Sequence, residues 1–150
     1  MTIHIYTDGG SLGNPGPGGY GAVLKFHQHR KELSEGYRMT TNNRMELLAV
    51  IRALEALKKP GMEVHVFTDS QYVQKAVSMG WVFNWEKKQF KGKKNADLWK
   101  EFLKIYRKHK VFFHWVKGHS GVPENERCDE LAKAAARKGR LLVDFGYENG

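Results

Sequence analysis

The order of the predicted strands and helices restricts the possible folds of this chain more than any other feature. Runs of β-branched and aromatic residues predict strands, and apolar residues recurring every three or four positions predict helices. Three strands come first, at 3–8, 19–26 and 31–39, followed by a helix at 43–59 and a strand at 62–69. Helices follow at 70–80 and within 81–109, then a strand entering a loop at 111–121 and a last helix at 123–139. Hairpin-linked strands are antiparallel, whereas strand–helix–strand passages give parallel neighbours. We therefore predict an α/β fold with a mixed five-stranded sheet, in which three antiparallel N-terminal strands precede parallel strands, and with helices on both faces.

Two of the predicted strands end in an aspartate. Asp8 closes the first strand, just before a loop rich in Gly and Pro, and Asp69 closes the strand at 62–69. Ligands of open α/β sheets bind beyond the carboxyl ends of parallel strands. If these two strands pair in parallel, both carboxylates reach one site. The alternative is that Asp8 is a hairpin turn residue that bonds nearby backbone N–H groups.

Glu46 falls on the apolar side of the predicted helix at 43–59. At about 100° per residue, its neighbours on the helix surface are Ala49, Val50, Ala53 and Leu57. The remaining charged residues are expected to face water on the opposite side: Arg44, Arg52, Glu55, Lys58 and Lys59. A buried, unpaired carboxylate is costly or becomes protonated, so a compensating cation is expected. The alternative is a glutamate that reaches solvent at the helix end or caps its N-terminus.

The last predicted helix adds a fourth carboxylate. Asp129 lies at the edge of the apolar face of this helix. Glu124 is the other candidate for a carboxylate that faces the core, but it lies in the first turn, where a negative charge interacts favourably with the helix dipole. Convergence of Asp8, Glu46, Asp69 and Asp129 would create strong repulsion, which hard divalent cations relieve. Mg²⁺ suits such a site because it combines a few carboxylates with waters and substrate phosphate. This set of residues points to phosphodiester chemistry with two metal ions, typically about 3.5–4 Å apart.

A histidine follows the last predicted strand. His119 lies in the loop "VKGHSGVPEN", between that strand and the helix of Asp129. An imidazole can pass protons at neutral pH. His119 is therefore a candidate for proton transfer, and the alternative is an ordinary surface histidine.

Composition predicts a single cytosolic domain that binds a polyanion. The 150 residues suit one domain spanning 1–150, and no stretch has the pattern of a signal peptide or the about 20 apolar residues of a membrane helix. The single cysteine, Cys128, excludes an internal disulfide and a zinc site built on several cysteines. Of the net charge of +9, residues 86–110 contribute ten Lys or Arg against three acidic residues. This field suits a polyanion, although a solvated Lys-rich face would look the same.

The last dozen residues show no clear pattern. The tail after Lys138 is accordingly expected to be free to move.

Seven stretches match one family in order and at compatible spacings, over most of residues 1–135. They are "YTDGGSLGNPGPGGYGAVL", "TTNNRMELLAVIRAL", "TDSQYV", "GWVFNW", "DLW", "WVKGHSG" and "PENERCDELA". In these stretches the chain closely resembles ribonuclease H of the bacterial type 1 family. The resemblance implies the ribonuclease H-like fold and endonucleolytic cleavage of the RNA strand of RNA/DNA hybrids, leaving 5′-phosphate and 3′-hydroxyl ends.

The resemblance also assigns the site. It implies two Mg²⁺ ions, with Mn²⁺ able to substitute, held by Asp8, Glu46, Asp69 and Asp129, with His119 in proton transfer and product release. It implies a monomer that needs no protein partner. The segment at 81–99 resembles the basic protrusion that grips the DNA strand in this family, with substrate contacts from Trp81, Trp85, Lys87, Lys88, Lys91, Lys93 and Lys94. We expect the aromatic residues to pack the protrusion onto the domain rather than to stack on bases.

Further substrate contacts are implied around the carboxylates. Selectivity for RNA requires a reader of the 2′-hydroxyl. The resemblance places Asn14, Asn43 and Gln71 near the minor groove of the hybrid, with Gly9 and Gly10 allowing close backbone approach, and assigns Thr41 and Asn42 to DNA phosphates. The alternative for the asparagines is a turn for Asn14 and a helix cap for the other two. The chain departs from many family members in a shorter basic loop and in Gly10 and Ser11, which replace Ser and Cys.

Two other functions use similar features. A DNA strand transferase or junction nuclease of the same fold also uses clustered carboxylates and Mg²⁺, but commonly with extra DNA-binding domains or as a dimer. A non-catalytic hybrid-binding module would be expected to lack one of the carboxylates, and all four are present.

Overall fold

The computed structural model describes residues 2–118 and 121–150, and the strands in this part of the chain form one mixed sheet. The strands are β1 (Thr2–Ser11), β2 (Gly16–Phe26), β3 (His29–Thr40), β4 (Glu63–Thr68) and β5 (Lys110–Trp115). Their order across the sheet is β3-β2-β1-β4-β5. The β1–β2 and β2–β3 pairs are antiparallel, whereas β1–β4 and β4–β5 are parallel. The predicted sheet is therefore confirmed, with β1 at its centre.

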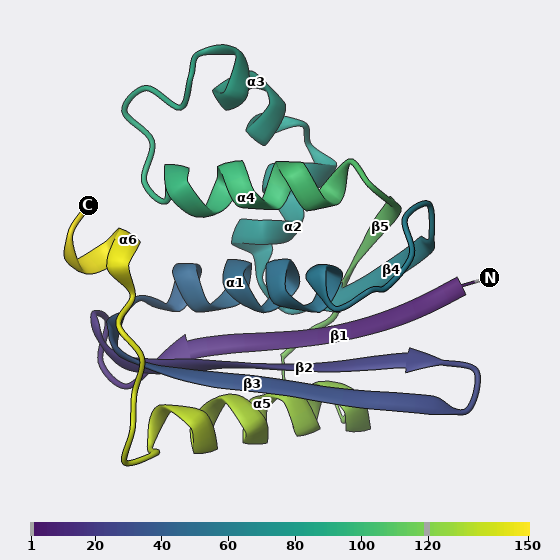
Figure 1. Ribbon diagram of the computed structural model, residues 1–150, viewed down its shortest axis with the longest axis horizontal. Coiled ribbons are helices and arrows are strands. Elements are labelled where there is room, and N and C mark those ends of the chain that lie inside the picture. Colours follow the sequence, from purple (N-terminus) through teal and green to yellow (C-terminus); the bar gives the residue numbers. More distant parts are fainter. Residues whose placement is uncertain (1, 119–120) are drawn as a thin grey trace.

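The helices lie in layers on this sheet. They are α1 (Asn42–Glu55), α2 (Gln71–Ser78), α3 (Trp81–Lys87), α4 (Ala96–Tyr106), α5 (Pro123–Ala136) and α6 (Phe145–Glu148). In Figure 1, α1 and α5 cover opposite faces of the sheet, and α4 packs on the outer side of α1. None of the helices in the described ranges is long and apolar enough to cross a membrane.

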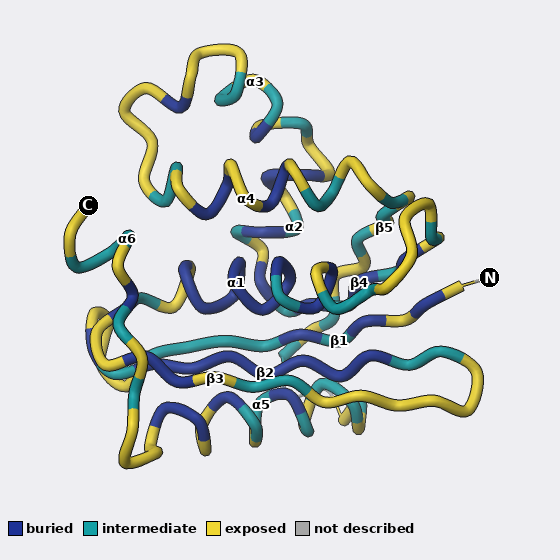
Figure 2. Tube along the Cα trace, viewed as in Figure 1, coloured by how far each residue is buried: buried dark blue, intermediate teal, exposed yellow. Residues whose placement is uncertain are grey.

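The main core lies between the sheet and α1. Burial alternates along β1 and β4, as expected for strands with one face in the core, and Ile5 and Val66 are fully buried. α1 is buried along most of its length (Figure 2). It lies between the sheet and α4, whose Trp99 and Phe102 belong to the same hydrophobic core. A helix packed between a sheet and a second helix is held firmly in place, and α1 carries Glu46.

The N-terminus of α1 differs from the sequence prediction. Its N-cap is Thr41, whose hydroxyl accepts a hydrogen bond from the Arg44 N–H at 3.3 Å. Asn42 and Asn43, whose alternative role was to cap the helix, are instead its first two residues. Thr and Asn are both good capping residues, so the sequence alone does not choose between them.

The C-terminus of α1 also differs. The helix ends at Glu55, before the predicted end at residue 59. The Gly61 N–H instead donates to the Lys108 carbonyl at 2.7 Å. This bond joins two connections at the end of the sheet, so residues 57–62 serve the crossover into β4 rather than the helix.

The tail after Lys138 packs on the domain. The Leu142 N–H donates to the Gly36 carbonyl and the Leu142 carbonyl accepts from the Arg38 N–H, both at 2.9 Å. These bonds add the tail to β3 as a parallel bridge, and α6 follows. The tail is held by backbone bonds, which leave no periodic signal in the sequence.

Arg44 attaches the tail to the rest of the domain through buried ion pairs. It was expected to face water, but its side chain is only 3% exposed. Its guanidinium donates to Asp144 Oδ2 at 2.8 Å and to Asp97 Oδ2 at 2.7 Å. Asp144 also accepts from the Thr40 hydroxyl at 2.6 Å. Helix α1, the start of α4 and the tail are thus joined through one buried cation.

Candidate active site

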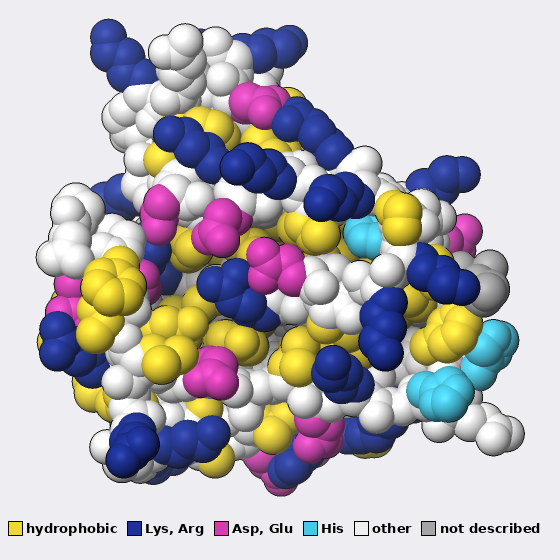
Figure 3. All heavy atoms as spheres, in the orientation of Figure 1, with side chains coloured by type: hydrophobic (Ala, Val, Ile, Leu, Met, Phe, Trp, Pro, Cys, Tyr) yellow, Lys and Arg dark blue, Asp and Glu magenta, His cyan; other side chains and the backbone are white. Residues whose placement is uncertain are grey.

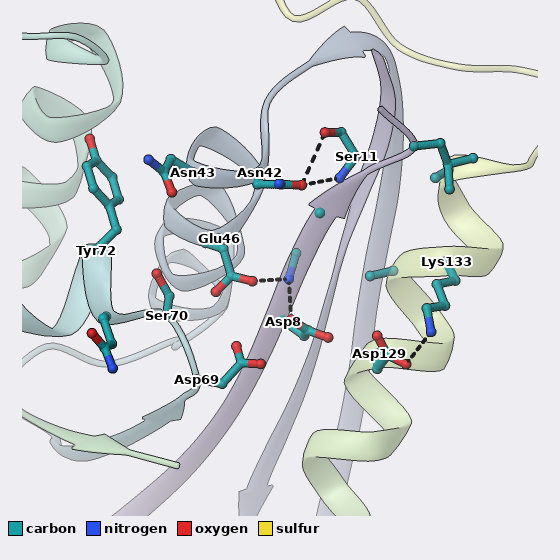
Figure 4. A pocket seen from close by; sticks show the side chains of 16 residues that line it. Asp8, Ser11, Asn42, Asn43, Glu46, Asp69, Ser70, Tyr72, Asp129 and Lys133 are labelled. Atoms are coloured by element: carbon teal, nitrogen blue, oxygen red, sulfur yellow. Dashed lines mark hydrogen bonds and ion pairs between the residues drawn. The ribbon is translucent and has the colours of Figure 1, made fainter. Parts of the chain in front are cut away.

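The parallel pairing of β1 and β4 brings two carboxylates together. Thr7 and Thr68 are register partners, so Asp8 and Asp69 follow at the same edge of the sheet. Asp8 lies within β1 and not in a turn. Glu46 reaches the same place from α1, and one carboxylate oxygen from each of the three lies within 4.8 Å of the others. Figure 4 shows these side chains pointing toward one another.

Gly9 sets how closely β1 and α1 approach at this point. A Cβ at Gly9 would lie 2.4 Å from the backbone carbon of Met45, so only glycine fits. Its N–H donates to Asp8 Oδ1 and to Glu46 Oε1, both at 2.9 Å. The backbone of Gly9 therefore holds two of the three carboxylates at a fixed separation.

Glu46 is buried, as the sequence predicted. It is 8% exposed, and its Oε2 has no hydrogen-bond partner among the described residues. Burial, followed by the charges of Asp8 and Asp69, raises the pKa of Glu46 well above its usual value. The compensating cation expected beside Glu46 is not Arg44, which pairs with Asp97 and Asp144. Glu46 Oε2 could therefore serve as a ligand to a bound cation.

Asp8 is perturbed in the same direction. Burial is the main cause that raises its pKa to about 7, and the neighbouring charges of Asp69 and Asp129 add to it. The three carboxylates offer only oxygen ligands, are partly buried and repel one another. Such a set of ligands binds hard divalent cations.

Asp129 lies on the wall of the same pocket but outside the close group of three. Its Oδ2 pairs with Lys133 Nζ at 2.9 Å, one turn along α5. Both residues line the pocket, which has a volume of about 450 Å³. Lys133 was missed in the sequence analysis, although its spacing of four residues from Asp129 is a recognisable signal. Glu124, the rival carboxylate, instead pairs with Lys25 at 3.1 Å.

Several residues assigned to the substrate surround the carboxylates. The rim of the pocket includes Gly10, Asn42, Asn43 and Gln71. The Asn42 side chain accepts from the Ser11 N–H at 2.7 Å (Figure 4), and the Asn42 N–H donates to Asn14 Oδ1 at 3.1 Å. These bonds tie the loop after β1 to the start of α1. Asn14 and Thr41 line an adjacent hollow together with Lys93 and Lys94.

The predicted protrusion comprises α3 and the loop that leads to α4. Lys and Arg side chains extend from this part of the molecule, at the top of Figure 3. Phe90 is buried and Trp85 packs edge-on against Trp99, so these aromatic residues hold the protrusion on the domain as expected. Trp81 differs, because it is 42% exposed. A shallow pocket on the protrusion is lined by Trp81, Asn84, Trp85, Lys88, Lys91 and Lys93.

His119 lies outside the described residues. Gly118, which precedes it, is beside Asp69, since a Cβ at Gly118 would lie 2.9 Å from Asp69 Oδ2. The described end of this segment therefore reaches the carboxylates.

Replacement of Glu46 by Gln should stabilise the metal-free protein. A carboxyl group whose pKa is raised on folding contributes stability only while it is protonated, and this contribution is lost as the pH rises toward the raised pKa. Gln has no charge to bury at any pH, so Glu46→Gln avoids the stability that the parent loses at high pH. At pH 8 in EDTA we therefore expect the free energy of unfolding to increase by roughly 1 kcal/mol or more. The gain should shrink toward pH 4, and urea unfolding at both pH values measures it.

The control is Glu55→Gln on the same helix, because Glu55 is exposed and pairs with Arg52 at the surface. It should change stability little at either pH. A Glu46→Gln protein that is clearly less stable than the parent at pH 8 would contradict the electrostatic account of this site.

Comparisons with known proteins agree with this geometry. The ribonuclease H family model matches residues 1–137. Ribonuclease H of Psychromonas ingrahamii is 55% identical over 151 residues, which cover 97% of both chains, and that of Proteus mirabilis is 58% identical over 150 residues, covering 97% of this chain and 92% of the relative.

Solved structures show the same fold. The crystal structure of LC9-RNase H1, described as a type 1 RNase H with the type 2 active-site motif, superimposes with a TM-score of 0.82 at 33% identity, covering 99% of this chain and 79% of that one. The structure of LC11-RNase H1 in complex with an RNA/DNA hybrid superimposes with a TM-score of 0.67 at 32% identity, covering 89% of this chain and 96% of that one. A family model that spans almost the whole domain, relatives identical at more than half of the positions and a carboxylate group at the ends of parallel strands lead to one conclusion: this chain belongs to the ribonuclease H family.

Proposed function

We propose that this chain is an endonuclease that hydrolyses the RNA strand of RNA/DNA hybrids with two bound Mg²⁺ ions, leaving 5′-phosphate and 3′-hydroxyl ends. The observation that carries the proposal is the group of Asp8, Glu46 and Asp69, with ligand oxygens within 4.8 Å of one another. The structure of LC11-RNase H1 with an RNA/DNA hybrid supports the choice of substrate.

The carboxylates fit Mg²⁺ in number and in chemistry. Glu46 Oε2 is buried without a hydrogen-bond partner among the described residues, so a cation ligand would complete its surroundings. Asp8, Glu46 and Asp69 would hold the metal, with Asp129 completing the set from α5. When bound, two Mg²⁺ ions supply an activated water and stabilise the charge on the leaving oxygen. Mn²⁺, with the same preference for oxygen ligands, would be able to substitute.

The chain itself contributes a fixed framework for the reaction. The Gly9 N–H holds Asp8 and Glu46 in place before substrate arrives, so these carboxylates need little rearrangement. Lys133 pairs with Asp129 and limits the repulsion on that side of the pocket. Proton transfer is assigned to His119, and reading of the 2′-hydroxyl to Asn14, Asn43 and Gln71, of which the last two line the pocket of the carboxylates.

The binding surface continues from the carboxylates to the protrusion. The carboxylate pocket and the hollow that contains Thr41, Lys93 and Lys94 share Asn43, and that hollow shares Lys93 with the pocket of Trp81 and Trp85. A duplex that spans these three depressions would meet acidic groups at the reacting phosphate and basic groups along the other strand. We infer that the chain works on this surface as a cytoplasmic monomer without an obligatory protein partner.

The test is cleavage of a uniformly labelled RNA/DNA hybrid in Mg²⁺, beside duplex DNA and duplex RNA of the same sequence. The proposal expects internal cleavage of the hybrid RNA alone, with products that carry a 5′-phosphate. Strand joining or junction cleavage of DNA would favour the strand-transferase or junction-nuclease alternative. Hybrid binding without cleavage would favour the non-catalytic alternative.

Removal of the protrusion's lysines should weaken binding rather than chemistry. Phosphate contacts stabilise the bound ground state and the transition state alike, so replacement of all five by Ala should raise KM and leave kcat unchanged. Each lysine–phosphate interaction that the variant removes should also flatten the log–log salt dependence of affinity by about 0.9. KM measured from low to moderate salt checks both effects on the variant with Ala at Lys87, Lys88, Lys91, Lys93 and Lys94.

The matched control removes the same number of exposed positive charges elsewhere. It carries Ala at Lys31, Lys58, Lys59, Lys108 and Lys110. An equal change in salt slope for both variants would mean that net charge, and not the protrusion, governs binding.

A further inference from the structure

A group of histidine and aromatic side chains lies on the sheet, away from the carboxylates. His4, His65 and Phe112 are register partners across β1, β4 and β5, and Tyr6, Phe67 and His114 form the next row on the same face. α5 covers this face chiefly over β1, β2 and β3. Over β4 and β5 the rings remain accessible, and Phe112 is 48% exposed.

Two imidazole rings of this group lie within hydrogen-bond distance of each other through one nitrogen each. His65 Nδ1 lies 2.7 Å from His114 Nε2, and the two ring planes are 21° apart. On its other side, His65 Nε2 lies 3.0 Å from Glu63 Oε2. Glu63 Oε2 also accepts from the Thr2 hydroxyl at 3.2 Å, so this carboxylate oxygen acts as an acceptor toward both residues. His65 therefore carries its proton on Nε2 and directs the lone pair of Nδ1 toward His114.

We propose that His65 Nδ1 and His114 Nε2 form a binding site for a borderline divalent cation such as Zn²⁺, with Glu63 as a positioning residue. Imidazole nitrogen suits Zn²⁺, whereas Mg²⁺ prefers oxygen ligands, so the two cations would select different sites on this chain. In the hydrogen bond between the two rings, His114 Nε2 carries the proton. On metal binding this proton moves to His114 Nδ1, so both facing nitrogens present lone pairs to the metal. Water fills the remaining coordination positions.

The geometry needs only a small adjustment. Two nitrogens about 2.0–2.1 Å from Zn²⁺ at a tetrahedral angle lie about 3.3 Å apart, so the present separation must widen by about 0.6 Å. His114 is exposed at the end of β5 and can turn to allow it. Stacking limits the other motions, because Phe112 packs on His65 with ring centroids 5.1 Å apart and Phe67 packs on His114 at 4.8 Å.

Two further features favour a metal at this position. Glu63, His65 and a metal would form a carboxylate–histidine–metal series, in which the carboxylate fixes the tautomer and orientation of the ligand. His114 is exposed, so water can reach the remaining coordination positions of a bound metal.

The test is calorimetric titration of the protein with Zn²⁺ in excess Mg²⁺, which keeps the carboxylate site filled. We expect one Zn²⁺ bound by the parent, and affinity at least tenfold weaker in His65→Ala and in His114→Ala. The matched control is His29→Ala, an exposed histidine at the start of β3, which should stay within twofold of the parent. Equal affinity in the parent and both site variants would overturn the proposal.

A spectrum of the intact parent gives an independent answer. In ¹⁵N NMR, Zn²⁺ should shift His65 Nδ1 and His114 Nε2, while His65 Nε2 keeps its proton. Glu63→Ala should weaken Zn²⁺ binding at least tenfold and release the fixed tautomer of His65, and Glu63→Gln, which keeps an acceptor oxygen, should restore both. Zn²⁺ shifts that leave these two nitrogens unchanged would place the metal elsewhere and contradict the assignment.

Discussion

Asp8→Asn and Asp69→Asn should each lower hybrid cleavage by at least about a thousandfold at saturating Mg²⁺. A metal ion contributes several kcal/mol to stabilisation of the transition state, and each 1.36 kcal/mol is a factor of ten in rate. Asn keeps the shape of the side chain but lacks the negative charge that holds the metal. Single-turnover cleavage with excess enzyme measures the chemical step directly.

The control for this result is Glu130→Gln, which removes an exposed charge on α5 next to Asp129. Glu130 pairs with Arg127 at the surface, so cleavage should stay near the parent rate. Affinity for the hybrid should persist in Asp8→Asn and Asp69→Asn, because each removes a charge that repels phosphate. Cleavage within tenfold of the parent in either variant would remove that residue from the metal site.

Arg44→Met should destabilise the protein by about 3–5 kcal/mol, the range for removal of one partner from a buried ion pair. The substitution leaves Asp144 buried at 7% exposure without its cation, beside a half-exposed Asp97. Urea unfolding at pH 7 measures the loss. Arg44 lowers the pKa of Asp97, so part of the parent's stability should disappear as the pH falls below about 4, and the variant should lack this part.

Arg52→Met on the same helix is the matched control. Arg52 is 35% exposed and pairs with Glu55 at the surface, so its loss should change stability by no more than about 1 kcal/mol. Similar losses for the two variants would show that the buried network contributes no more than a surface pair. Tail residues that exchange amide hydrogens faster in Arg44→Met would trace the effect to α6.

Local patterns predicted the sheet and the close carboxylates well. Alternating β-branched residues predicted that Asp8 and Asp69 close their strands. Asp69 does follow the end of β4, whereas β1 continues past Asp8 to Ser11. The parallel register of β1 and β4 follows from the crossover through α1. The helical period placed Glu46 toward the core because its neighbours on that side are apolar. These features depend on residues close in sequence, for which periodicity is informative.

Long-range polar contacts could not be predicted in the same way. Arg44 is buried because Asp97 and Asp144 reach it from distant segments, and a helical wheel contains no term for partners outside the helix. The tail is held by backbone bonds to β3, which any sequence can form. The pairing of Asp129 with Lys133 was within reach of sequence reasoning, since both lie on one helix.

The central position of β1 has a consequence for synthesis of the protein. β1 is the first strand along the chain, but its parallel partner β4 begins at Glu63, and the helix that carries Asp129 ends at Ala136. A ribosome makes about 5–20 residues per second, so the middle strand waits for seconds with one edge unpaired. The hairpin partner β2 comes next and protects only the other edge. No nascent chain that lacks α5 contains all four carboxylates of the proposed metal site, so on that proposal cleavage can begin only after residues 123–136 have been made.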